Sequence, residues 1–194
     1  MNAGMKLVIL DRDGTINEER ADFVKSEAEW VPLPGALDAI ARLNQAGWHV
    51  VLATNQDGLG RGLFEMATLN AIHAKMNRVL AEAGGRIDAV FFCPHRPEEN
   101  CDCRKPLPGL MRQIGERYAI DLSTVPVCGD ALRDLEAGAA AGCPTHLVLT
   151  GKAVHAGPGE VDRWLEQVPG TRVHADLPAF VDHLLGPNAR DGDR

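Results

Sequence analysis

The sequence lacks the features that mark membrane, secreted and nucleic-acid-binding proteins. No apolar run approaches the ~18 residues that a membrane-spanning helix needs. The start, MNAGMKLVILDRD, has an apolar stretch followed by charges and no small-residue cleavage site, which argues against a signal peptide and for a cytoplasmic protein. The chain has 20 Lys and Arg against 27 Asp and Glu, with no basic stripe, so nucleic acid is not an expected partner.

The sequence also lacks a disulfide framework, internal repeats and low-complexity tracts. It has five cysteines, an odd number, and Cys101 and Cys103 are one residue apart. A disulfide staple would need an oxidising compartment and better spacing, so none is expected. A length of 194 residues fits one domain with a real core. We expect a single domain over residues 1–187 and a flexible polar tail over residues 188–194.

Short apolar runs alternate along the chain with longer segments of helical period. The expected strands are residues 6–10, 49–54, 89–92, 125–128, 146–149 and 171–177. The expected helices are residues 34–47, 64–85, 109–120, 131–143 and 178–185. Nearly continuous apolar strands are typical of a parallel sheet covered on both faces, so the pattern predicts a doubly wound α/β fold. Residues 14–33 form an unusually long polar connection, which indicates a functional role.

Polar residues follow the expected strands at the points where ligands bind in such sheets. Asp11 and Asp13 follow the first strand, Thr54 the second, and Asp130 and Asp134 the fourth. One such residue alone would be read as a helix cap or a turn residue, but caps do not explain the set. Converging carboxylates repel one another unless a cation lies between them, and a few oxygen ligands suit Mg²⁺. The sequence therefore predicts a magnesium site suited to phosphoryl transfer.

A second group of metal-binding side chains lies in CPHRPEENCDCRKP, residues 93–106. Three thiolates and one imidazole favour Zn²⁺, and four protein ligands leave no position for a reactive water. Zinc would therefore be structural and would deliver Arg104 and Lys105 to the phosphate site; a catalytic metal and unligated thiols are the alternatives. The expected zinc ligands, spaced C-x-H-x5-C-x-C, are Cys93, His95, Cys101 and Cys103.

Four motifs, LDRDGTIN, TNQ, RKP and GDALRD, resemble in order those of the haloacid dehalogenase superfamily of phosphatases. The resemblance extends over the whole chain, and the Cys/His segment narrows it to a subfamily with a zinc loop and no separate cap domain. It implies a Rossmann-like, haloacid dehalogenase fold. It also implies a hydrolase of phosphoric monoesters with catalytic Mg²⁺ and structural Zn²⁺.

The resemblance implies roles for the matching acidic residues. Asp11 would attack phosphorus and form an aspartyl-phosphate. Asp13 would protonate the leaving oxygen and then deprotonate the attacking water. Mg²⁺ would be held by the carboxylates of Asp11 and Asp130 and by the backbone carbonyl of Asp13, while Asp134 would orient these groups.

The resemblance also implies which residues meet the substrate. Thr54 and Lys105 would stabilise the transferring phosphoryl group. The expected substrate contacts are Asn55, Gln56, Arg104, Lys105, Glu19 and Asp22. The remaining partner expectations are a small sugar phosphate, no membrane and no nucleic acid, and a monomer is compatible with the sequence.

Two substrates remain open within the subfamily. ADFVKS and RGLF resemble enzymes that remove the 7-phosphate of D-glycero-D-manno-heptose 1,7-bisphosphate, on the route to nucleotide-heptose and lipopolysaccharide core. Asp57 instead resembles the histidinol-phosphate phosphatases of histidine biosynthesis, and Ala131 departs from the Lys of some heptose enzymes. A standalone chain of this length favours the heptose substrate. The alternative outside enzymes is a phospho-switch domain, which shares the sheet and the acidic pocket.

Overall fold

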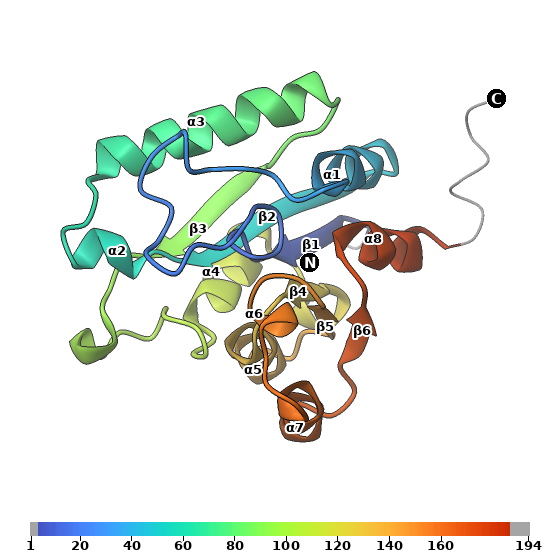
Figure 1. Cartoon of the computed structure of the whole chain (residues 1–194). Helices are drawn as coiled ribbons and strands as arrows, with labels where there is room; N and C mark the ends of the chain where they lie inside the picture. The colour runs from blue at the N-terminus through green and yellow to red at the C-terminus, as the bar shows by residue number, and fades with distance from the viewer. Residues whose placement is uncertain (1–3, 187–194) are drawn as a thin grey trace.

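A six-stranded, wholly parallel sheet organises the chain in the computed structural model, which describes residues 4–186 (Figure 1). Its strand order is β3-β2-β1-β4-β5-β6. The strand bounds are β1 Lys6–Leu10, β2 Trp48–Asn55, β3 Ala89–Cys93, β4 Val127–Gly129, β5 Thr145–Val148 and β6 Arg172–His174. The order reverses at β1, so the chain after β1 begins near the middle of the sheet, where doubly wound folds bind ligands.

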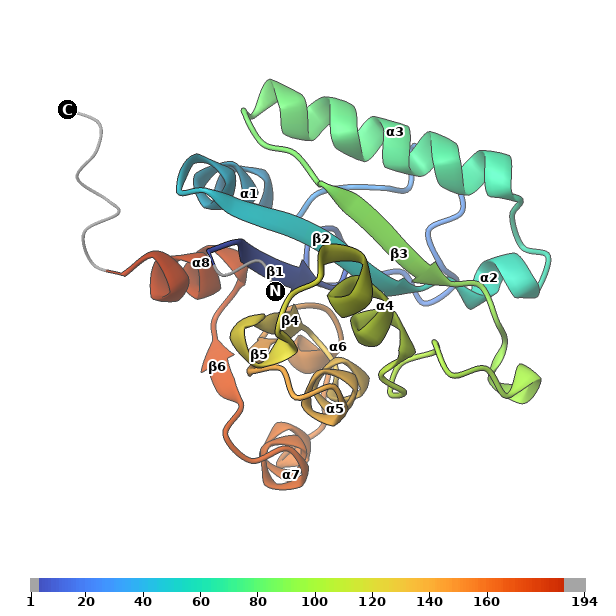
Figure 2. The ribbon, with the colours of Figure 1, turned by 180° about the vertical axis from the view of Figure 1, so that it is seen from behind.

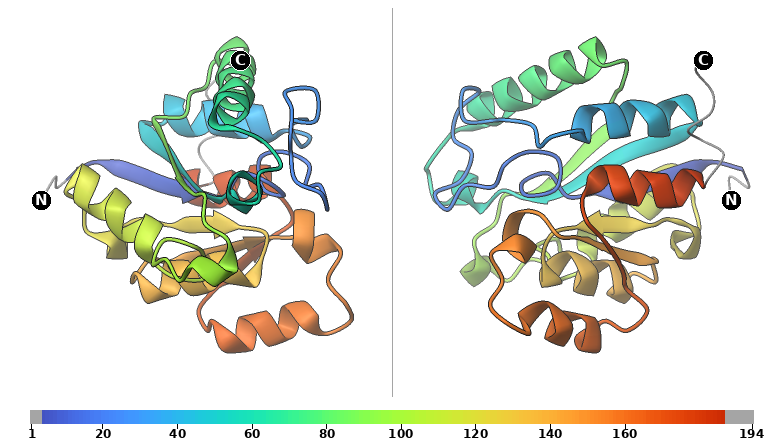
Figure 3. Two further views of the ribbon diagram at one scale, coloured as in Figure 1. Left: turned by 90° about the vertical axis from the view of Figure 1, so that its left-hand side faces the viewer. Right: turned by 45° about the vertical axis from the view of Figure 1, so that its right-hand side comes forward.

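Helices cover both faces of the sheet. Their bounds are α1 Ala36–Gln45, α2 Asp57–Gly60, α3 Met66–Glu82, α4 Gly109–Tyr118, α5 Leu132–Ala140, α6 Gly151–Val154, α7 Glu160–Gln167 and α8 Leu177–Leu185. Short 3-10 turns lie at Pro97–Glu99 and Leu122–Thr124. Helices α1, α3 and α8 pack on one face, and α4, α5 and α7 lie on the other, as Figures 2 and 3 also show.

The central strand β1 explains why the buried runs are apolar without alternation. Val8 and Leu10 contribute to the core beneath α1, α3 and α8. Leu7 and Ile9 contribute to the core beneath α4. Because successive side chains of a strand point to opposite faces, a strand covered on both sides buries its residues alternately in the two cores, and in β1 only Lys6 at the start is exposed.

The long connection after β1 is held to the body of the protein by apolar anchors. Ile16, Val24 and Trp30 are buried and belong to the core beneath α1, α3 and α8. The Nζ of Lys75 on α3 donates to the backbone oxygen of Trp30 at 2.8 Å. The connection is therefore an ordered wall beside the carboxyl end of the sheet.

The predicted strands and helices are all present, with shifts at their ends. The fourth strand begins at Val127, two residues later than predicted. Helix α7 was not predicted, although Val161, Trp164, Leu165 and Val168 follow the spacing of a helix face. The fold is the predicted doubly wound α/β sheet. The predicted tail over 188–194 lies outside the described residues, and no helix in the described part of the chain is long and apolar enough to cross a membrane.

Candidate active site

The carboxyl ends of β1, β2 and β4 bring the predicted acidic and hydroxyl residues to one place. Asp11 directly follows β1, Thr54 lies at the end of β2, and Asp130 follows β4. The three side chains are buried, with exposed fractions of 4%, 1% and 1%. Parallel strands deliver these groups to the same edge of the sheet, so the separated motifs of the sequence meet there.

Lys105 is the buried cation of this edge. Its Nζ lies 2.9 Å from Asp11 Oδ1, 2.7 Å from Asp134 Oδ1 and 2.7 Å from the backbone oxygen of Ala53, to which it donates. Burial opposes its charge, but the carboxylates of Asp11 and Asp134 outweigh burial and raise the pKa of Lys105. A permanently charged ammonium therefore lies against the Asp11 carboxylate.

Asp11, Asp130 and Asp134 form a cluster whose carboxylate oxygens lie within 4.8 Å of one another. Burial, and then the charge of Asp134, raise the pKa of both Asp11 and Asp130. Asp11 Oδ2 is buried and has no hydrogen-bond partner among the described residues. Crowded carboxylates with an unmatched oxygen fit a hard divalent cation such as Mg²⁺, which would supply the missing charge and contact.

Two glycine turns hold the Asp130 carboxylate in position. Gly14 and Gly151 have φ angles of +84° and +48°, and a Cβ on either residue would collide with Asp130 Oδ2. That oxygen accepts a hydrogen bond of 2.7 Å from the backbone N–H of Lys152. The turns after β1 and β5 thus close on this carboxylate, and any larger residue would displace it.

Asp13 is held apart from the carboxylate cluster by hydrogen bonds from three side chains, those of Arg12, Asn17 and Gln56. Arg12 Nη2 lies 2.8 Å and 2.9 Å from its two oxygens, and Asn17 Nδ2 and Gln56 Nε2 each donate at 2.9 Å. Burial would raise the pKa of Asp13, but Arg12, Asn17 and Gln56 lower it overall. Arg12 is itself fully buried, with Nη1 3.1 Å from His73 Nε2 on α3. The Asp13 carboxylate is therefore ionised and fixed in direction.

The amide side chains that follow Thr54 are engaged by protein groups. Asn55 accepts from the backbone N–H of Lys105 at 3.0 Å and donates to its backbone oxygen, also at 3.0 Å. Gln56 donates to Thr54 Oγ1 at 2.9 Å as well as to Asp13. Asn55 therefore locks the Lys105 segment against β2, and Gln56 links Thr54 to Asp13.

Asp57 does not present an unpaired charge. Its carboxylate lies 3.0 Å from Arg61 Nε and 3.3 Å from Arg104 Nη1. Burial raises its pKa, but these two guanidinium groups lower it overall. The negative charge of Asp57 is thus neutralised inside the protein.

The predicted Cys/His cluster is assembled after β3. His95 Nδ1 lies 3.5 Å from Cys93 Sγ and 3.3 Å from Cys103 Sγ, and Cys93 Sγ lies 3.6 Å from Cys101 Sγ. All four ligand atoms lie within 4.8 Å of one another, and all five cysteines of the chain are free of disulfides. A tetrahedral zinc ion would separate its ligand atoms by about 3.5–3.8 Å, so the spacing suits such an ion.

Glu19 and Asp22, the two substrate contacts predicted in the long connection, lie in different places in the structure. Glu19 lines a cavity of about 200 Å³ together with Asp13, Asn55 and Arg104. Asp22 is exposed and instead pairs with Lys25 Nζ at 2.6 Å, away from that cavity.

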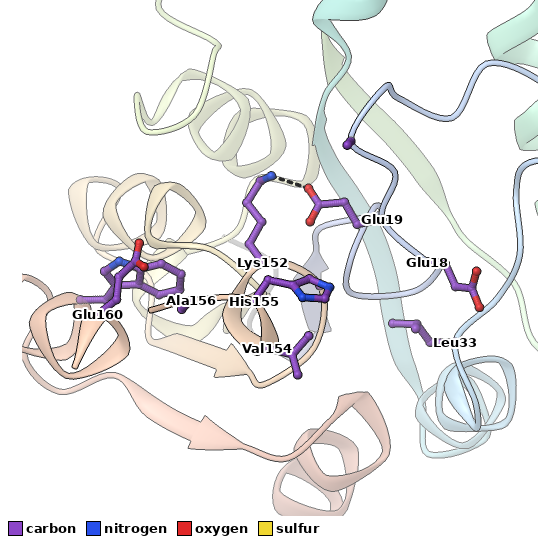
Figure 4. Close-up of a pocket in the computed structure, with 11 residues that line it drawn as sticks. Glu18, Glu19, Leu33, Lys152, Val154, His155, Ala156 and Glu160 are labelled. Atoms are coloured by element: carbon purple, nitrogen blue, oxygen red, sulfur yellow. Dashed lines mark ion pairs between the residues drawn. The ribbon is translucent and has the colours of Figure 1, made fainter. Parts of the chain in front are cut away.

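A larger cavity of about 660 Å³ adjoins the first and shares Glu19 and Lys152 with it. Figure 4 shows the side chains of these two residues pointing toward each other, where they form an ion pair. The carboxylate cluster does not line this larger cavity, which instead lies between the long connection and helices α6 and α7.

Two cations of the smaller cavity were missed from the sequence. Arg133, on the first turn of α5, and Lys152, on α6, both line it. The signal was available, since both follow strand ends at the same edge of the sheet as the predicted residues. Arg133 even lies within the GDALRD motif.

Comparison with known proteins gives consistent similarities. A profile of the HAD-hydrolase-like family matches residues 102–179. The D-glycero-beta-D-manno-heptose-1,7-bisphosphate 7-phosphatase of Bordetella bronchiseptica is 57% identical over 93% of this chain and 98% of that protein. The protein of the same name from Pseudomonas aeruginosa is 47% identical over 92% of this chain and 97% of that protein.

The chain is also similar to a protein of solved structure. The crystal structure of the D,D-heptose 1,7-bisphosphate phosphatase of B. bronchiseptica, complexed with magnesium and phosphate, superposes with a TM-score of 0.86. It is 57% identical and covers 93% of this chain and 98% of its own. That relative thus binds both ions that the carboxylate cluster and its neighbouring cations are suited to hold.

Proposed function

The chain belongs to the family of D-glycero-β-D-manno-heptose-1,7-bisphosphate 7-phosphatases, and we propose that it removes the 7-phosphate of this sugar through an aspartyl-phosphate intermediate. The observation that carries the proposal is the buried Asp11 carboxylate, with Lys105 on one oxygen and no partner on the other, in a chain 57% identical to a named family member. The enzyme is a phosphoric monoester hydrolase.

Asp11 is the proposed nucleophile. One of its oxygens forms a bond to phosphorus while the bond between phosphorus and the C7 oxygen of the sugar breaks. The leaving oxygen takes the proton of Asp13. Burial and the charge of Asp134 raise the pKa of Asp11, whereas Lys105 on one oxygen and a metal ion bound at the other would favour its ionised form, so no separate base would be needed.

Asp13 serves both half-reactions. A bound phosphate places negative charge beside this residue, which raises its pKa and favours the protonated form that the leaving oxygen needs. In the second half-reaction the ionised carboxylate takes a proton from water. The water oxygen then bonds to phosphorus, and the bond to Asp11 breaks. Arg12, Asn17 and Gln56 hold the carboxylate in the direction required by both steps.

Mg²⁺ would be held by the carboxylates of Asp11 and Asp130 and by the backbone carbonyl of Asp13. When bound, it neutralises charge on the phosphoryl oxygens. Asp134 stays outside this set, because one of its oxygens pairs with Lys105 and the other accepts from the backbone N–H of Ala131 at 3.1 Å. Thr54 and Lys105 complete the phosphoryl site.

Zinc has a structural role in the proposal. Bound by Cys93, His95, Cys101 and Cys103, it would fix the segment that continues directly into Arg104 and Lys105. Thiolate ligands persist in a reducing compartment, which fits the cytoplasmic location that we also propose.

The heptose substrate is favoured over histidinol phosphate by the environment of Asp57. Arg61 and Arg104 neutralise this carboxylate, so it neither repels a second phosphate nor remains available to an ammonium group. The smaller cavity also presents Arg133 and Lys152, which suit a second anion.

A side-by-side assay tests the proposed substrate. We expect kcat/KM for heptose 1,7-bisphosphate to exceed that for histidinol phosphate by at least about 100-fold, since an ammonium group would be repelled by Arg133, whose Nε has no hydrogen-bond partner among the described residues. Equal or faster turnover of histidinol phosphate would overturn the assignment.

A further inference from the structure

Arg133 is a cation of the smaller cavity that the proposed chemistry leaves without a task. It lies in the first turn of α5, and its Nε is buried without a hydrogen-bond partner among the described residues. A buried guanidinium nitrogen that no protein group matches is costly unless something else binds there. A ligand is the obvious source of the missing acceptor.

The surroundings of Arg133 keep it charged. Burial opposes the charge, but the carboxylates of Asp134, Asp11 and Asp130 outweigh it and raise the pKa of Arg133. Ala131, at the start of the same helix, contributes no charge, so Arg133 is the cation that this helix end brings to the cavity.

Besides Arg20 of the long connection, the smaller cavity has three cations that follow strand ends, and the sheet order separates these three into two groups. Arg104 comes from the segment that follows β3, on one side of β1, whereas Arg133 and Lys152 follow β4 and β5 on the other side. Arg104 is paired with Asp57, and Lys152 with Glu19. Asp11, at the end of β1, therefore lies between two separate sources of positive charge.

Lys152 also lies where the larger cavity opens, whereas Arg133 lines only the smaller cavity. Lys152 and Glu19 line both cavities, so a sugar whose reacting phosphate meets Asp11 can extend past Lys152 into the larger space (Figure 4). The reacting phosphoryl group is already served by Lys105, which is 2.9 Å from Asp11. Arg133 and Lys152 are thus placed for a different part of the substrate.

We propose that Arg133, assisted by Lys152, binds the phosphate that is not hydrolysed and thereby sets the preference for a sugar bisphosphate over a monophosphate. The planar fork of arginine matches two phosphate oxygens, and the ammonium of Lys152 adds a point charge once it leaves Glu19. This inference rests on the proposed function, because it assigns one end of the same substrate.

The test compares heptose 1,7-bisphosphate with heptose 7-phosphate, which lacks only the distal phosphate. For Arg133→Gln we expect kcat/KM on the bisphosphate to fall about 10- to 100-fold through a higher KM, and kcat/KM on the monophosphate to change less than about 2-fold. Arg133→Lys should recover part of the loss, and Lys152→Gln should act in the same direction.

Direct binding of the product gives a second readout that does not depend on turnover. Isothermal titration of heptose 1-phosphate should show about 10-fold weaker binding to Arg133→Gln than to the wild type. Arg112→Gln, a change at an exposed position of α4, is the matched control and should alter neither substrate preference nor product binding.

Equal losses on both substrates, with wild-type turnover intact, would overturn the inference alone, because Arg133 would then serve the reacting phosphate or the fold. Unchanged product binding would do the same. Failure of the wild type to hydrolyse either heptose phosphate would instead overturn the proposed function, and the inference with it.

Discussion

At the scale of single residues, the contact between Asp11 and Lys105 allows a carboxylate to be both buried and ionised. A buried carboxylate is unstable by itself, yet a nucleophile must be partly desolvated and ionised. Lys105 meets both demands because it is buried, charged and within 2.9 Å. The second oxygen of Asp11 has no protein partner, so it is the one available for an ion or a phosphorus atom.

Asp11→Asn tests this arrangement. We expect turnover to fall by at least about 1,000-fold, because an amide is a far weaker nucleophile, while the fold and the zinc content persist. Phosphate release measures the first expectation, and circular dichroism with metal analysis measures the second. Substantial residual turnover would remove Asp11 as the nucleophile.

The motifs identified these residues from the sequence, but not all of their partners. Asp-x-Asp-Gly-Thr and Gly-Asp mark the acidic residues, because their position after a strand is visible in the chain. The contact between Arg12 and His73 joins residues 61 positions apart. Likewise, the engagement of Asn55 by the Lys105 backbone depends on how β3 pairs with β2. Such contacts follow from packing, which local spacing does not encode.

At the scale of elements, the segment between β3 and α4 couples the Cys/His cluster to the active site. The cluster ends at Cys103, and Arg104 and Lys105 follow without an intervening residue. The segment is also tied to α4, because the N–H of Gly109 donates to the backbone oxygen of Asp102 at 3.0 Å. A Cβ at Gly109 would collide with that oxygen, so the segment and helix approach closely only because this residue is glycine.

Cys101→Ser tests the coupling. We expect loss of most bound zinc and a fall of about 10-fold or more in kcat/KM, since Arg104 and Lys105 lose their support. Cys143→Ala, at a buried cysteine outside the cluster, is the control and should retain zinc. Zinc loss with unchanged kinetics would contradict the coupling.

Buried and partly buried histidines at the β5–β6 edge of the sheet predict how the stability of the fold depends on pH. His146 on β5 and His174 on β6 are hydrogen-bonded at 2.9 Å and pack near His183 and Phe180 of α8, with Arg172 close by. Burial, and then the neighbouring cationic groups, lower the pKa of His146 to about 3 and also lower that of His174.

The folded state therefore binds fewer protons than the unfolded chain below the ordinary histidine pKa of about 6.5. Stability is fully present above that pH and is lost as the pH falls through 6.5 toward 3. We expect urea unfolding to show a loss on the order of 1 kcal/mol between pH 7 and pH 5 that is reduced in His146→Gln. An identical pH dependence in the variant would exclude His146 as the source.

The sequence predicted which strands and most of the longer helices are present, but it predicted their first and last residues less well. Apolar runs identified the interior strands because a strand covered on both faces has little choice of residues, whereas the edge strand β6 was predicted although Arg172 and Val173 are exposed. Helix α7 was missed although its apolar spacing is regular, because it follows a Gly- and Pro-containing stretch that reads as a loop. The buried anchors of the long connection, such as Trp30, were also hidden among polar neighbours.

At the scale of the whole molecule, the active site concentrates buried negative charge. This charge lowers the stability of the folded state, but the proposed chemistry requires it. Asp11, Asp130 and Asp134 share a buried site with a single close ammonium, that of Lys105, and the repulsion raises the pKa of Asp11 and Asp130. Functional sites commonly hold such unfavourable arrangements, and the remaining packing compensates for them.

Asp130→Asn tests this cost. Removing one buried charge should raise the free energy of unfolding without added metal by about 1 kcal/mol, while abolishing most turnover. The wild type should gain thermal stability in Mg²⁺ because the ion binds the folded state, and the variant should gain less. Thermal melts with and without Mg²⁺ measure both effects. A less stable variant with an undiminished response to Mg²⁺ would contradict the account.

Asp11 is proposed to carry the phosphoryl group during turnover, and rapid acid quenching can detect that intermediate. The wild type and Asp13→Ala would be mixed with heptose 1,7-bisphosphate, quenched and digested, and the peptides weighed by mass spectrometry. We expect one phosphoryl group on the peptide that contains Asp11, formed and lost more slowly in Asp13→Ala because that variant lacks both the acid for the first step and the base for the second. Phosphate release with no phosphorylated peptide, or with the group on another residue, would contradict it.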